Sequence, residues 1–96
     1  MDGLNNLKNK LANCEKVYGS TLLHFGFSGV PVIYKRSGAD FLVIDMEHGT
    51  FFPENVGDLC YAGRKEDLPM IARVQDCEYH CISKCIDMGC DGVIIP

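Results

Sequence analysis

The sequence predicts an α/β fold built on a parallel β-sheet, and three observations support it. Short apolar segments alternate with amphipathic ones along the 96 residues. The connections between them are short, which is typical of βα units with right-handed crossovers. The expected strands are apolar throughout, as in strands that are buried on both faces. Either a doubly wound sheet or a barrel satisfies this pattern.

The first elements follow from leucine spacing and from helix start signals. Leu4, Leu7 and Leu11 recur at intervals of three and four residues and predict a short amphipathic helix. Residues 18–25 are expected to form the first strand. A helix is predicted over residues 30–36, because a proline suits its first turn and Ser-Gly follows its end.

The same unit repeats in the rest of the chain. Strands are predicted at residues 41–45, 70–74 and 93–95, and helices from 53 to about 63 and from about 78 to 88. No helix follows the fourth strand, which would leave an open sheet edge. We therefore expect residues 1–96 to form a single partial domain that is truncated after the fourth strand, unless a partner covers that edge.

Composition argues against several classes of function. The net charge is −4, and Lys and Arg form no run longer than two residues, so a nucleic-acid partner is not expected. The longest apolar run has four residues, far short of a membrane span, and the polar opening segment does not resemble a secretory signal. We expect a cytoplasmic protein, with no membrane partner, whose six cysteines are reduced thiols.

Titratable side chains gather where the predicted strands end. His24 follows the first strand, Asp45, Glu47 and His48 follow the second, and Arg73 lies at the end of the third. In parallel α/β sheets the carboxyl ends of the strands form the ligand-binding edge. The placement therefore favours an active site.

Each of these residues also has a purely structural interpretation. His48 beside two carboxylates is a natural general base, whereas Asp45 could simply cap the loop after its strand. Arg73 stands alone in an apolar strand, where arginine needs an anionic partner. That partner could be a carboxylate or enolate substrate, or an internal salt bridge to Glu47 or Asp45.

Two further patterns carry little functional weight. Cys77, Cys81 and Cys85 recur every four residues on one predicted helix face, but the spacing fits no common zinc or iron–sulfur site. Packing of small thiols against the sheet is the favoured interpretation. The Gly-Phe-Ser-Gly loop at 26–29 lacks the glycine fingerprint and the Lys/Ser pair of a phosphate loop.

Several segments together resemble the HpcH/HpaI class II pyruvate aldolases. They are the Asn-Leu-Lys of residues 6–8, the GADFLVIDMEHG run at 38–49, the IARV run at 71–74 and the IDMGCDGVIIP run at 86–96. Their order and intervals match the family from end to end. The resemblance covers nearly the whole chain but only about the first third of the family's pattern. It implies the N-terminal half of a (β/α)8 TIM barrel.

The resemblance also implies an activity and residue roles. Members of the family are aldehyde-lyases that cleave 4-hydroxy-2-oxo acids reversibly into pyruvate and an aldehyde. By this resemblance His48 is the acid/base residue for the 4-hydroxyl, and Arg73 steadies the pyruvate enolate oxygen. Asp45 and Glu47 belong to the surrounding polar shell, and Asp87 is a candidate partner that positions His48.

The family uses a divalent metal, Mg²⁺, Mn²⁺ or Co²⁺, as the electron sink for the enolate. The resemblance places the metal ligands beyond Pro96, so the 96 residues alone are predicted to be inactive, and a homo-oligomer is expected at full length. Two alternatives stay open. One is a noncatalytic half-barrel that oligomerises and binds a small anion, and the other is a citrate-lyase-like enzyme acting on acyl-CoA.

Overall fold

The computed structural model describes residues 2–96 and contains four helices and four strands in strict alternation, beginning with a helix. In chain order these are α1 (Asp2–Ala12), β1 (Gly19–Leu22), α2 (Gly29–Arg36), β2 (Phe41–Asp45), α3 (Pro53–Lys65), β3 (Met70–Arg73), α4 (Tyr79–Asp87) and β4 (Gly92–Ile94). No helix among these residues is long and apolar enough to cross a membrane.

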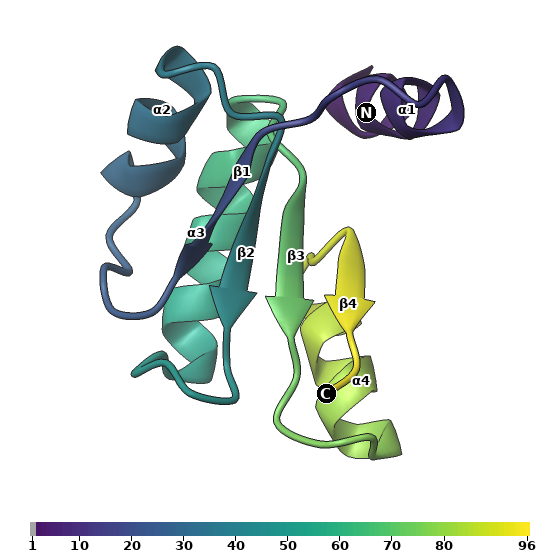
Figure 1. Cartoon of the computed structure of the whole chain (residues 1–96). Helices are drawn as coiled ribbons and strands as arrows, with labels where there is room; N and C mark the ends of the chain where they lie inside the picture. The colour runs from purple at the N-terminus through teal and green to yellow at the C-terminus, as the bar shows by residue number, and fades with distance from the viewer. Residues whose placement is uncertain (1) are drawn as a thin grey trace.

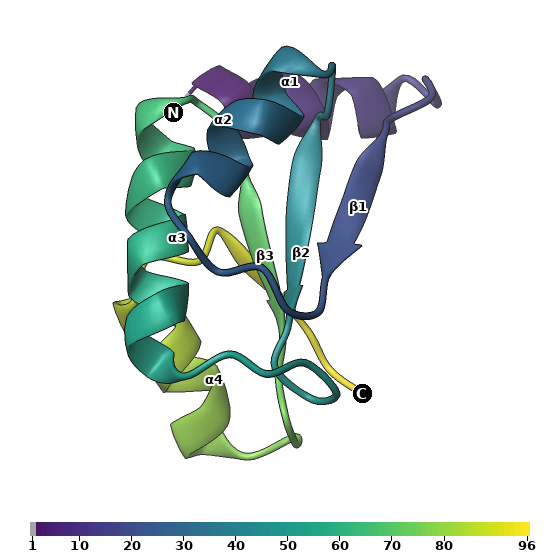
Figure 2. The ribbon, with the colours of Figure 1, turned by 90° about the vertical axis from the view of Figure 1, so that its left-hand side faces the viewer.

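The strands form one parallel sheet in the order β1-β2-β3-β4 (Figure 1). Sequential strands are spatial neighbours, so every crossover adds the next strand on the same side of the previous one. Figure 2 shows the consequence: α2, α3 and α4 all lie on one face of the sheet, and α1 lies across the ends at which the strands begin. A doubly wound sheet would have helices on both faces. The arrangement is therefore that of the N-terminal half of a TIM barrel.

The hydrophobic core lies between the sheet and the helices. Leu42 and Ile44 of β2 are fully buried in it, and the intervening Val43 points to the opposite face, as expected from the two-residue period of a strand. Leu59 of α3 and Cys85 of α4 pack against the same face of the sheet. This core fixes the spacing of β2 and β3, and with it the position of the side chains at their ends.

The structure confirms the predicted order of elements and corrects two boundaries. β1 ends at Leu22, three residues earlier than predicted, because its ladder with β2 ends at the Leu22–Ile44 pair. α4 begins at Tyr79, so Cys77 precedes the helix and is exposed. The prediction that Cys77, Cys81 and Cys85 share one helix face was therefore wrong for Cys77, because the backbone is still extended at Glu78.

Candidate active site

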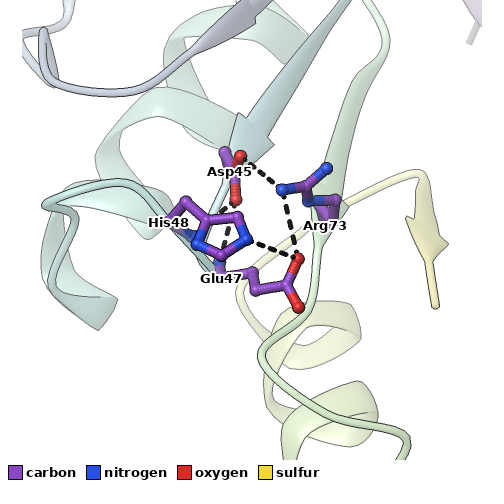
Figure 3. A network of polar contacts seen from close by, with 4 residues as sticks. All are labelled: Asp45, Glu47, His48 and Arg73. Atoms are coloured by element: carbon purple, nitrogen blue, oxygen red, sulfur yellow. Dashed lines mark hydrogen bonds and ion pairs between the residues drawn. The ribbon is translucent and has the colours of Figure 1, made fainter. Parts of the chain in front are cut away.

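Two neighbouring strands end in charged residues at the same level of the sheet. Asp45 is the last residue of β2 and Arg73 the last residue of β3, and the two are paired in the parallel register. Their side chains meet directly, with 3.1 Å between Arg73 Nη2 and Asp45 Oδ2. Glu47 and His48 follow Asp45 in the next turn and complete a group of four residues (Figure 3). We call these four residues the rim quartet.

Asp45 organises the turn that carries the other acidic residue and the histidine. Its Oδ1 accepts hydrogen bonds of 2.9 Å from the backbone N–H groups of Glu47 and His48. Burial leaves Asp45 only 3% exposed and disfavours its charged form, but the two N–H donors and the Arg73 guanidinium outweigh this cost. The pKa of Asp45 therefore lies below its ordinary value, and the residue is a fixed negative charge at neutral pH.

Glu47 connects the arginine to the histidine. Its Oε1 accepts from Arg73 Nη2 at 3.1 Å and lies 3.3 Å from His48 Nε2. His48 itself is largely exposed, whereas Arg73 is two-thirds buried. The quartet thus runs from a buried carboxylate through a guanidinium and a second carboxylate to an imidazole in contact with solvent.

Arg73 keeps unused hydrogen-bonding capacity within this arrangement. The ion pairs to Asp45 and Glu47 are both made by Nη2, and the buried Nε has no hydrogen-bond partner among residues 2–96. A guanidinium carries five N–H donors in a planar fork. An anionic ligand at this edge could bind the Nη1 donors, which take no part in the ion pairs to Asp45 and Glu47.

The structure brings four of the five predicted site residues together. Asp45, Glu47, His48 and Arg73 form the quartet, and the salt-bridge interpretation of Arg73 is confirmed for both carboxylates. The capping interpretation of Asp45 is also confirmed. These structural roles leave the catalytic ones open, since an arginine held by two carboxylates is also oriented for a ligand.

Asp87 is the residue that the structure does not place with the others. It is the last residue of α4, and it is exposed. A helix between parallel strands runs in the opposite direction to them, so its last residue lies toward the ends at which strands begin. No polar contact joins Asp87 to His48 in the part of the chain that the structure describes, so one chain alone does not give Asp87 the positioning role predicted for it.

Residues 2–96 do not form a metal site by themselves. Residues 2–96 contain no group of three or more histidine, cysteine or acidic side chains that could hold an ion. The carboxylates of Asp45 and Glu47, the nearest candidates, are both engaged by Arg73. A divalent metal at this edge would need ligands from elsewhere.

The loop after β2 is hydrogen-bonded to the segment that follows β1, a connection that the sequence did not predict. The Thr50 N–H donates to the Leu23 carbonyl at 2.8 Å, and Thr50 Oγ1 lies 3.3 Å from His24 Nδ1. Gly49 allows this approach, because a Cβ there would collide with the carbonyl oxygens of Asp45 and Leu23. Glycine directly after His48 was the only available signal. Within residues 2–96, His24 therefore makes its polar contact with this loop and none with the quartet.

Several solved enzymes have the same fold. The HpcH/HpaI aldolase from Desulfitobacterium hafniense DCB-2 matches 94% of this chain with a TM-score of 0.86 and 23% identity. Citrate synthase SbnG matches 94% with a TM-score of 0.81 and 33% identity. Macrophomate synthase matches 96% with a TM-score of 0.71 and 25% identity. No family model and no curated protein matches the sequence.

The matches extend over only part of each relative. The chain covers 35% of the aldolase, 36% of the citrate synthase and 32% of macrophomate synthase. It therefore spans about a third of their length.

Proposed function

The chain belongs to the HpcH/HpaI-type family of enzymes, and from this we propose that it supplies part of the active-site edge of an aldehyde-lyase. The proposed reaction is the reversible cleavage of a 4-hydroxy-2-oxo acid into pyruvate and an aldehyde. The observation that carries the proposal is the rim quartet, in which a guanidinium with free donors and an exposed imidazole share one carboxylate.

Arg73 is proposed to bind the oxygen on which negative charge develops. Cleavage of the C3–C4 bond leaves an enolate, and a guanidinium held in place before the reaction stabilises that charge without reorganising. The ion pairs to Asp45 and Glu47 supply this orientation. Binding by the free donors also keeps the pairs intact, so no carboxylate is left buried and unpaired during turnover.

His48 is proposed to move the proton at the 4-hydroxyl. In cleavage it accepts this proton, directly or through water, as the hydroxyl becomes the aldehyde carbonyl. Its ring is exposed, and Glu47 Oε1 lies 3.3 Å from Nε2, which orients the ring. The same group returns the proton in the condensation direction.

We further propose that a divalent metal, Mg²⁺, Mn²⁺ or Co²⁺, takes part and that its ligands come from the rest of the barrel. Residues 2–96 offer no complete ligand set. A homo-oligomer and a cytoplasmic location belong to the same proposal.

A second candidate is condensation of the citrate-synthase type. It is favoured by the 33% identity to citrate synthase SbnG, which is higher than the 23% identity to the aldolase. Both reactions make or break a carbon–carbon bond next to a carbonyl group. The quartet suits either, because an enolate oxygen and a proton transfer are common to both.

The decisive experiment places residues 1–96 in a complete barrel. They replace the matching third of the D. hafniense aldolase, and the chimera is incubated with Mg²⁺ or Mn²⁺ and pyruvate in D₂O. Loss of the pyruvate methyl proton signal reports enolate formation without an aldehyde. The chimera is then given a panel of aldehydes, and product formation is followed in both directions.

We expect the chimera to exchange the methyl protons of pyruvate. Arg73→Ala should lower the rate of this exchange by about 10²- to 10³-fold. Arg36→Ala, at an exposed position on α2, is the matched control and should retain full exchange. A folded chimera that exchanges pyruvate equally well with and without Arg73 would overturn the assignment of that residue. A folded chimera without exchange would favour the citrate-synthase reaction if it condenses an acyl donor with an oxo acid, and the noncatalytic half-barrel if it does not.

A further inference from the structure

Four sulfur atoms from separate segments of the chain lie in or against the hydrophobic core. Cys60 lies in α3, Cys85 in α4, Cys90 in the connection to β4, and Met46 directly after β2. The Sγ atoms of Cys60 and Cys90 are 3.5 Å apart, and Cys85 Sγ lies 3.4 Å from Met46 Sδ. All three cysteines are buried and unbridged. Nothing in the proposed reaction uses these thiols.

The Sγ atoms of Cys60 and Cys90 are close enough to form a bond after a small movement. A disulfide bond is about 2.05 Å long, so each sulfur would need to move only about 0.7 Å from the observed separation. The backbone is also close, because the Cβ position of Gly89 is 3.5 Å from Cys60 Cβ. Gly89 has a positive φ of 100°, which turns the chain after α4 and brings Cys90 against α3. Cys85 lies against Met46, and its thiol also interacts with that of Cys90.

We propose that Cys60 and Cys90 are an oxidisable dithiol that forms an intramolecular disulfide with a small neutral peroxide. The Cys60 thiolate attacks one peroxide oxygen, the O–O bond breaks, and water leaves with Cys60 converted to a sulfenic acid. The Cys90 sulfur then attacks the Cys60 sulfur, the S–O bond breaks, and a second water leaves. The two thiols lose two protons and two electrons in total, and hydrogen peroxide becomes two waters.

The local electrostatics assign the two roles. The contact with the Cys90 thiol lowers the pKa of Cys60, whereas the same contact and burial raise the pKa of Cys90. Cys60 is thus the better nucleophile of the pair. Burial raises the pKa of Cys85, which makes the third thiol less reactive. Because the pair is buried, a small oxidant should react faster than a bulky disulfide such as oxidised glutathione.

The test uses the full 96-residue chain with Cys14→Ser, Cys77→Ser and Cys81→Ser. These three positions are not fully buried, and the substitutions leave the three buried thiols unchanged. The folded chain is treated with hydrogen peroxide, denatured, and alkylated with N-ethylmaleimide. An aspartate-specific protease then cuts before Asp87 and separates Cys85 from Cys90. Mass spectrometry identifies the linked peptides.

We expect a loss of two hydrogens, one alkylated thiol at Cys85, and a cross-link between the peptides that contain Cys60 and Cys90. The same chain oxidised in 8 M urea should give a mixture of linkages, since proximity is then lost. Alkylation of all three thiols after peroxide treatment, a sulfinic acid in place of a cross-link, or a dominant link through Cys85 would each overturn the proposal. The result does not depend on whether the complete barrel is an aldolase.

Discussion

Asp45 offers the sharpest test of how the quartet is held, because its roles can be removed one at a time. Asp45→Asn keeps the Oδ1 acceptor for the Glu47 and His48 N–H groups but loses the charge that faces Arg73. A hydrogen bond to a charged group contributes about 1.5–3 kcal/mol and a neutral one about 1 kcal/mol. The difference is about 0.5–2 kcal/mol, and we therefore expect Asp45→Asn to lower the free energy of unfolding by about this amount.

Asp45→Ala removes the acceptor as well and leaves the N–H groups of Glu47 and His48 and the Arg73 guanidinium without it. Breaking a buried charge pair in this way costs about 3–5 kcal/mol. Urea denaturation of the chain at pH 7, followed by far-UV circular dichroism, measures both variants. Asp58→Asn is the matched control, since Asp58 is exposed on α3 and its substitution should cost less than about 0.5 kcal/mol.

The pH dependence gives an independent check on the same residue. The pKa of Asp45 is lowered in the folded chain, so its ionisation stabilises the fold above the unfolded pKa of about 3.9. This contribution is lost as the pH falls below 3.9 through the folded pKa. Asp45→Asn should flatten the stability profile in that acidic range. Equal stability of Asp45→Asn and the parent chain from pH 7 to pH 3 would refute the reasoning.

Three further predictions concern the loop, the core and the histidine. Gly49→Ala should lower stability by about 1–3 kcal/mol in urea denaturation, because the new Cβ meets two carbonyl oxygens; an unchanged midpoint would contradict the collision. Leu59→Ala should cost about 2–5 kcal/mol, whereas Ile33→Ala, at an exposed position, should cost far less. In the chimeric barrel, His48→Gln should slow aldol cleavage by about 10²-fold or more while pyruvate methyl exchange falls less, and His80→Gln should change neither rate; equal losses in both assays would remove His48 from the 4-hydroxyl step.

The interior strands were predicted well because local sequence determines them. Residues 41–45 are apolar up to a single terminal aspartate, and the observed β2 has these bounds. The edge strand β1 was predicted too long, because the sequence of residues 23–25 is also typical of a strand. The length of β1 is set by the ladder with its neighbour, which stops at Ile44. A strand boundary that depends on a partner is not encoded in the strand itself.

The same distinction applies to the site. Asp45, Glu47 and His48 lie within four residues of one another, and Arg73 follows at the end of the next strand, so topology alone predicts that they meet. Asp87 was assigned through resemblance, and the antiparallel course of α4 keeps it from His48 in this chain. The contact between Cys60 and Cys90 joins residues thirty positions apart in different elements. Periodicity within one helix could not reveal it.

The order of the strands has a consequence for how such a barrel can be divided. β2 and β3 supply the rim quartet, and both have a partner strand on each side within this chain, whereas the two open edges belong to β1 and β4. A recombination event that joins this segment to a different second half would create new strand pairs only at β1 and β4. The stretch from Asp45 to Arg73 would be inherited as one piece, so the rest of the barrel could diversify in substrate choice while this charged group stayed intact.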